Sequence, residues 1–252
     1  MKRFEKFAHH QFKALIRHLK KYRDAKKPET LHKIRIDIKK IKAILGVIDD
    51  NEKQFKAHKK FTPFRNIFRK AAEIRASNVN EHLLMSHEMD KGDATPGHAN
   101  VKKLIRSYVS SIPSFITTTK RNRNKLKTEV THVKRNDLVR YLHKKQKEIK
   151  SQLFPRPKMR HIHKTRKDVK EVMYLSEANG KVSNKEINFY DKMQEKIGEL
   201  HDKQMLLQLL KKKSDQTGKT QFEGIKAECL ADKKEIIHLA TTFYRLNAES
   251  KR

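Results

Sequence analysis

Apolar residues recur at helical spacing along most of this chain of 252 residues, and this periodicity limits the possible folds most strongly. In residues 4–22, for example, the apolar side chains would form one stripe along a helix. Seven glycines and six prolines are few for a loop-rich β protein. No run of alternating β-branched residues stands out. The sequence therefore predicts an all-α fold.

Prolines, glycines and polar clusters divide the chain into two sets of four predicted helices. The first set comprises residues 4–22, 28–47, 63–84 and a stretch from 101 onward. The second set comprises residues 135–152, 158–178, 184–213 and 218–248. Pro63 is expected to open the third helix, Pro113 to kink or break the fourth, and residues 87–98 to form a loop. The predicted domains are residues 1–130 and 131–252.

The two sets of helices are related in sequence. A shift of 131 positions aligns His32 with His163 and brings four further identical pairs into register. These pairs are Lys33 with Lys164, Arg35 with Arg166, Asp37 with Asp168 and Lys39 with Lys170. One helix later, AAEIRASNV (71–79) lies opposite IGELHDKQM (197–205). The same pattern in the same order predicts an internal duplication.

A basic face borders the apolar stripe in the segment LHKIRIDIKKIKAIL, residues 31–45. At about 100° per residue, four cationic or titratable side chains share an arc of roughly 80°. They are His32, Arg35, Lys39 and Lys42. By contrast, Lys33 and Lys40 project from another side of the helix, where solvated charges are expected. Long stems that cover the core edge would explain any one cation, but a repeated set favours an anionic ligand that supplies the counter-charge.

The charge balance points to the same conclusion. Sixty-one Lys and Arg against 29 Asp and Glu give a formal net charge of +32, which attracts polyanions. Nucleic acid, an anionic membrane surface and an inorganic polyanion are the candidate partners. With no tryptophan and 7% aromatic residues, the chain has few side chains for base stacking. Non-specific RNA or DNA binding stays open as an alternative, as does a scaffold that recruits enzymes.

The motif HxxRxxxKKxK at residues 32–42, its copy at 163–170 and the helices with AAEIR and IGELHD resemble the CHAD family, the conserved histidine α-helical domains. The resemblance covers nearly the whole chain. It implies two four-helix bundles with pseudo-twofold symmetry and non-catalytic binding of inorganic polyphosphate along a basic groove between them. It also implies a triphosphate tunnel enzyme or a polyphosphate kinase as a candidate partner, and polyphosphate granules as a candidate location.

Ten residues form the predicted polyphosphate site: His32, Arg35, Lys39, Lys42, Arg69, Arg75, His163, Arg166, Lys167 and Lys170. The arginines would act as forked donors, the lysines as point charges and the histidines as donors that gain charge when protonated. The chain departs from the family pattern in both halves. Glu171 and Met173 replace usual basic residues and weaken the second face, while Ala72 and Ala76 replace a usual glycine and a usual acid. The second half keeps Gly198 and Asp202.

Other chemistry is poorly supported. There is no glycine-rich phosphate loop and no recognisable catalytic constellation, so no enzyme activity and no cofactor are expected. His87 and Glu88 begin an HExxH-like string, but Lys91 stands at the second histidine position, so no metal site is expected. A single Cys229 cannot form an internal disulfide. With no transmembrane run and no secretory signal, a cytoplasmic location is expected.

Overall fold

The computed structural model describes residues 3–86, 98–155, 157, 159–179, 183–211 and 216–249. Every regular element within these residues is helical, which confirms the predicted all-α class. The predicted loop at 87–98 lies outside the described residues apart from His98, which begins a helix. No helix in the described parts of the chain has the length and apolar character needed to cross a membrane.

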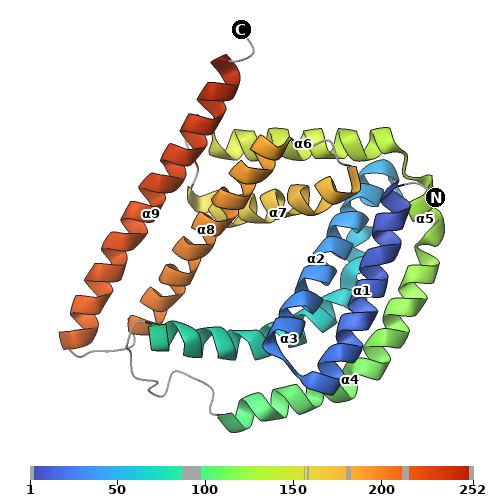
Figure 1. Cartoon of the computed structure of the whole chain (residues 1–252), viewed down its shortest axis with the longest axis horizontal. Helices are drawn as coiled ribbons and strands as arrows, with labels where there is room; N and C mark the ends of the chain where they lie inside the picture. Colours follow the sequence, from blue (N-terminus) through green and yellow to red (C-terminus); the bar gives the residue numbers. More distant parts are fainter. Residues whose placement is uncertain are drawn as a thin grey trace. The chain divides into compact units, whose positions relative to one another are not determined.

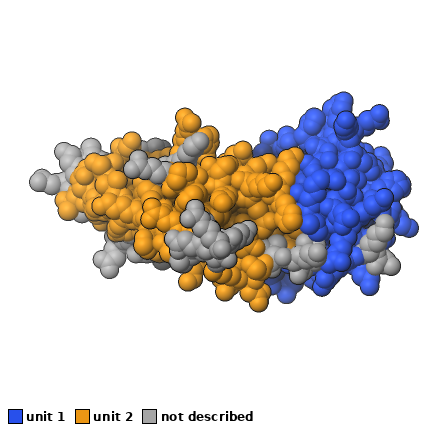
Figure 2. All heavy atoms as spheres, turned by 90° about the horizontal axis from the view of Figure 1, so that it is seen from above, with its two compact units in different colours: residues 1–141, 177–180 blue, residues 142–176, 181–252 orange. Residues whose placement is uncertain are grey.

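The chain forms two compact units (Figure 2). Unit 1 comprises Met1–Tyr141 with Glu177–Gly180, and unit 2 comprises Leu142–Ser176 with Lys181–Arg252. The helices in chain order are α1 (Arg3–Ala25), α2 (Pro28–Asn51), α3 (Ala57–Ser86), α4 (His98–Lys125), α5 (Lys127–His132), α6 (Arg135–Leu153), α7 (Ile162–Asn179), α8 (Asn184–Leu210) and α9 (Gln216–Glu249). A single 3-10 turn, Met159–His161, precedes α7.

In unit 1, α1 packs against α2 and α4, and α3 packs against α2 and α4 (Figure 1). Aromatic pairs hold these helices together, with Phe12 and Phe64 at 5.9 Å and Tyr22 and Tyr108 at 5.5 Å between ring centroids. Because α2 contacts both α1 and α3, its buried surface is wider than one apolar stripe. Its side toward α1 buries Asp37, whose carboxylate lies 2.6 Å from His18 Nδ1.

The structure of unit 1 departs in detail from what the sequence predicted. Helix α3 begins at Ala57, whose N–H donates to Asp49 Oδ1 at 2.8 Å, so Pro63 lies inside the helix and does not open it. Helix α4 continues through Pro113 and bends along its length (Figure 1), so of the two predicted outcomes, a kink or a break, only the break is excluded. Between the two sets of predicted helices, the short α5 was not anticipated. It buries Val130 after Leu126 leaves the helical conformation.

In unit 2, α8 packs against α9, and polar contacts tie α7 to α6. Thr165 donates to Gln152 Oε1 at 2.6 Å, and the Gln152 amide donates to the buried carboxylate of Asp168 at 3.3 Å. Phe189 and Phe243 stack at 3.8 Å between α8 and α9. As with Asp37, burial of Asp168 against the preceding helix fixes which side of α7 faces inward.

Candidate functional site

Arg35 on α2 lies against α3. Its Cζ is 4.2 Å from the centre of the Phe68 ring, and its Nη1 donates to the Phe68 carbonyl at 3.4 Å. The Lys39 ammonium lies 6.0 Å from the same ring. The face of an aromatic ring attracts cations, so Phe68 holds two neighbouring positive charges on one side of α2.

Two further residues of the predicted arc meet groups on α3. Arg75 Nη1 lies 2.7 Å from His32 Nδ1, and Lys42 Nζ lies 5.9 Å from the Phe61 ring. Because an arginine N–H can only donate, His32 Nδ1 must accept this hydrogen bond and carry its proton elsewhere. We call His32, Arg35, Lys39, Lys42 and Arg75 the first basic cluster.

The positive charge of the Arg35 guanidinium is not offset by the groups that hold it. Burial, together with the charge of Arg75, lowers the pKa of Arg35 to about 10. Its Nε is buried and has no hydrogen-bond partner in the described part of the chain. The two groups that hold it, a carbonyl oxygen and an aromatic ring, carry no formal charge. A buried donor without a partner costs about 1–3 kcal/mol, and more when charged, so this position favours an anion.

In unit 2, the corresponding helices form a similar arrangement. Arg166 Nε on α7 donates to the Gln194 carbonyl of α8 at 3.0 Å. The rings of His163 and His201 meet edge to face with 4.7 Å between their centroids. Burial lowers the pKa of His201, and the neighbouring His163 and Arg166 lower it further. We call His163, Arg166, Lys170 and His201 the second basic cluster.

The contacts of the two clusters occupy equivalent positions in sequence. The shift of 131 that relates α2 to α7 carries Arg35 to Arg166. A shift of 126 relates α3 to α8 and carries Phe68 to Gln194. The same two shifts carry the pair of His32 and Arg75 to the pair of His163 and His201. Each pair of helices therefore brings residues at equivalent sequence positions into contact.

A glycine on α8 makes room for Arg166. A Cβ atom at Gly198 would lie 2.6 Å from Arg166 Nη2 and 3.2 Å from its Cζ. The equivalent position in the first half carries Ala72, and there the guanidinium of Arg35 lies over Phe68 instead. The missing side chain at Gly198 therefore decides where the Arg166 guanidinium sits.

Some predicted residues are placed less centrally. Arg69 and Lys167 are exposed, each one position beyond a cluster contact and therefore about 100° away around its helix. Lys40 was expected to be a solvated charge, and this was wrong. Its side chain is 16% exposed and its ammonium pairs with Glu177, which is grouped with unit 1, at 2.8 Å. Lys33 is exposed as expected.

The second face carries an acidic neighbour. Burial alone would lower the pKa of Lys145, but Glu171, Asp168 and Glu148 together raise it. Glu171 therefore acts on Lys145 of α6.

Phe68, Gln194 and His201 complete the clusters and were not among the predicted residues. Their roles depend on contacts between helices, and the only local signal was a glycine in the middle of a helix. Among the described residues, no three His, Cys, Asp or Glu side chains gather as a metal site would require.

Comparison with known proteins places the fold. No family model matches the sequence, and no curated protein is similar to it. The structure is similar to the crystal structure of the CHAD domain from the plant Ricinus communis, with a TM-score of 0.62 and 16% sequence identity. The match covers 95% of this chain and 90% of that chain. The chain therefore has a CHAD-like fold, as its motifs indicated.

Proposed function

We propose that this chain binds inorganic polyphosphate, without catalysing a reaction on it, through the first and second basic clusters. The observation that carries the proposal is Arg35, a half-buried cation beside Arg75 whose Nε has no hydrogen-bond partner among the residues that the structure describes. A phosphate bound beside Arg35 and Arg75 would offset the repulsion between their two guanidinium groups and accept charge-assisted hydrogen bonds from them. Charge-assisted hydrogen bonds of this kind are about twice as strong as neutral ones.

Both clusters offer what a chain of phosphates can use. Their guanidinium forks match phosphate geometry, and their lysines add point charges. The two rings at the first cluster, Phe61 and Phe68, already lie beside the cations of Lys42, Arg35 and Lys39. They are therefore poorly suited to stack on bases, which is how single-stranded nucleic acids gain sequence-independent affinity. The CHAD-like fold agrees with this choice, since resemblance to that family implies polyphosphate binding.

A competition experiment tests the proposal. Fluorescently labelled polyphosphate of long chain length should bind at about 0.15 M salt, where attraction between distant surface charges is largely screened. Unlabelled polyphosphate should displace it at a phosphate concentration at least about tenfold lower than duplex DNA or single-stranded RNA requires. Equal competition per phosphate would show that the chain is a non-specific polyanion binder and would remove polyphosphate as its ligand class. The salt dependence of the affinity alone does not distinguish polyphosphate from nucleic acids, because the binding of each of these ligands releases counterions.

The second basic cluster should make the affinity for polyphosphate depend on pH. His201 has a lowered pKa in the free protein, and a bound anion would raise it. At pH values between the pKa of His201 in the free protein and its pKa in the complex, ligand binding is accompanied by uptake of a proton. Affinity therefore rises as pH falls through this range, and it levels off below the pKa of His201 in the free protein. We expect affinity to increase about threefold from pH 8 to pH 5.5 through His201, whose ring packs against that of His163.

Substitution of the pair by glutamine checks this. His163→Gln with His201→Gln should flatten most of the rise, measured as the dissociation constant at each pH. The control is His58→Gln with His238→Gln, which removes two exposed histidines from other helices and should leave the profile unchanged. A profile altered equally by both double variants would show that histidines act through overall charge alone.

A further inference from the structure

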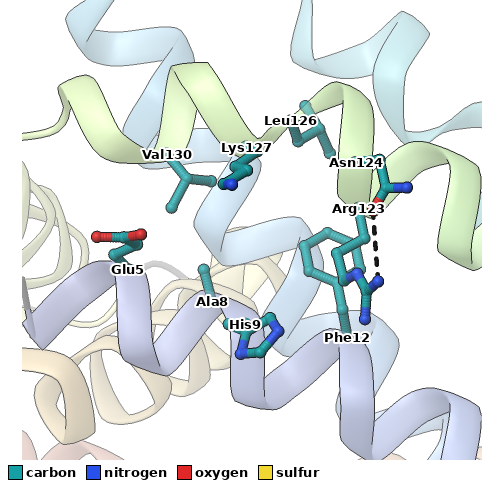
Figure 3. Close-up of a pocket in the computed structure, with 9 residues that line it drawn as sticks. All are labelled: Glu5, Ala8, His9, Phe12, Arg123, Asn124, Leu126, Lys127 and Val130. Atoms are coloured by element: carbon teal, nitrogen blue, oxygen red, sulfur yellow. Dashed lines mark hydrogen bonds between the residues drawn. The ribbon is translucent and has the colours of Figure 1, made fainter. Parts of the chain in front are cut away.

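Large apolar side chains are rarely exposed in the part of the chain that the structure describes. Even the pocket between α1, α4 and α5 is lined by Phe12, Leu126 and Val130 with only 1%, 1% and 6% of their surfaces exposed (Figure 3). Two side chains of α9 differ, since Leu230 is 54% exposed and Ile237 is 39% exposed. Among the described residues they are the only large apolar side chains that are exposed, and both lie on the same helix.

Leu230 and Ile237 lie on one side of α9. They are seven residues apart, close to two helical turns, so their side chains point only about 20° away from each other. The side of α9 that packs against α8 lies roughly 80–140° away around the helix (Figure 1). Its buried apolar residues include Ile225, Cys229, Ile236 and Ala240. Packing between α8 and α9 therefore leaves Leu230 and Ile237 uncovered.

The acidic side chains of α9 whose positions are described all pair with lysines. Glu223 pairs with Lys226, Glu228 and Asp232 pair with Lys203 of α8, and Glu235 pairs with Lys196 of α8. By contrast, Lys233 and Lys234 pair with no acid in the described part of the chain. These two lysines lie on either side of Leu230, about 60° and 40° away around the helix. We call Leu230, Lys233, Lys234 and Ile237 the outer face of α9.

We propose that the outer face of α9 binds an acidic amphipathic helix of another protein. Leucine-like side chains of that helix would cover Leu230 and Ile237, and its carboxylates would pair with Lys233 and Lys234. An amphipathic helix suits this face because its apolar side chains recur every three or four residues, which matches two anchors seven residues apart. The proposal is independent of polyphosphate binding, since the outer face contains no residue of either basic cluster.

Charge complementarity selects this occupant over two others. A second copy of the chain would bring two molecules of formal net charge +32 together and place the lysines of two α9 helices beside each other. A membrane surface would supply anionic groups, but a helix that binds in the membrane interface needs a wide apolar face. The outer face of α9 offers only Leu230 and Ile237.

The experiment uses the full chain and a fluorescently labelled peptide of about 18 residues, which is long enough to form a helix. Its leucines recur every three or four residues and are bordered by glutamates. A second peptide has the same composition, with the leucines distributed around the helix. Measured by fluorescence anisotropy at about 0.15 M salt, the first peptide should bind at least about tenfold more tightly than the second, because only the first can bury a leucine stripe on α9.

Two variants of the chain locate the binding site. Leu230→Gln with Ile237→Gln should raise the dissociation constant of the first peptide about tenfold, because two apolar anchors are lost. Lys233→Gln with Lys234→Gln should raise it about threefold to fivefold. The matched control is Lys20→Gln with Lys21→Gln, which removes the same charge from two adjacent exposed positions on α1 and should change it less than about twofold.

Four outcomes would overturn the proposal. Equal binding of the two peptides, or equal losses in the two lysine pairs, would show that overall charge attracts the peptide. A dimer in analytical ultracentrifugation that dissociates in Leu230→Gln with Ile237→Gln would assign the outer face to a second copy. Binding to phosphatidylserine vesicles that is lost in the same variant would assign it to a membrane surface. Polyphosphate affinity measured in these variants should stay unchanged, and it shows separately whether the basic clusters function.

Discussion

Arg35→Met is expected to weaken polyphosphate binding about 30-fold, which corresponds to about 2 kcal/mol, while the free protein keeps its stability. Methionine retains the apolar stem against Phe68 but removes the charge. In the absence of ligand, the substitution loses a long hydrogen bond and a cation–ring contact, and it relieves a buried donor without a partner and repulsion from Arg75. These effects oppose each other, so unfolding free energy should change by less than about 1 kcal/mol.

The control for this prediction is Arg121→Met, the same substitution at an exposed arginine of α4. It removes the same charge and should weaken binding less than about threefold, because an exposed charge contributes little. Dissociation constants would come from fluorescence anisotropy, and unfolding free energies from urea denaturation. If both variants lose the same affinity, bulk charge explains binding. If Arg35→Met unfolds the protein, Arg35 is a structural residue and the proposed role fails.

Most helices were predictable because their signals are local. The apolar spacing of residues 4–22 and the proline at position 28 identify α1 and the start of α2 within a few residues. Errors arose where a tertiary contact overrides the local signal. Pro63 lies inside α3 because the helix begins earlier, at Ala57, whose N–H donates to the Asp49 carboxylate. Six residues of α5 have too little sequence to show a period.

The candidate site, like the fold, could be predicted from the sequence only in part. The arc of His32, Arg35 and Lys39 follows from helical geometry and was visible in the sequence. Which groups they meet was not, because Phe68 lies on another helix and offers a carbonyl oxygen as well as a ring. Lys40 was misjudged for the same reason, since Glu177 lies 137 residues away along the chain. The fold supplies these contacts.

Gly198→Ala should lower polyphosphate affinity about tenfold while making the free protein slightly more stable. The new Cβ would lie 2.6 Å from Arg166 Nη2, the end of a flexible side chain, so the guanidinium moves and the helix does not. Alanine within a helix is favoured over glycine by about 0.5–1 kcal/mol, which accounts for the gain in stability. Displacing Arg166 removes one charge-assisted hydrogen bond to the ligand, worth about 1.5–3 kcal/mol, of which the moved side chain recovers part.

Gly224→Ala is the matched control, because the same change in α9 places its Cβ where no atom lies within 4 Å. It should raise stability by a similar amount and leave affinity unchanged. A double-mutant cycle then ties the effect to Arg166. In an Arg166→Gln background, which has already lost the guanidinium, Gly198→Ala should cost no further affinity. An equal loss in both backgrounds would mean that Gly198 acts through something other than Arg166. No loss in either would mean that the position of this guanidinium does not contribute to binding, and the first basic cluster would then carry the function without the second.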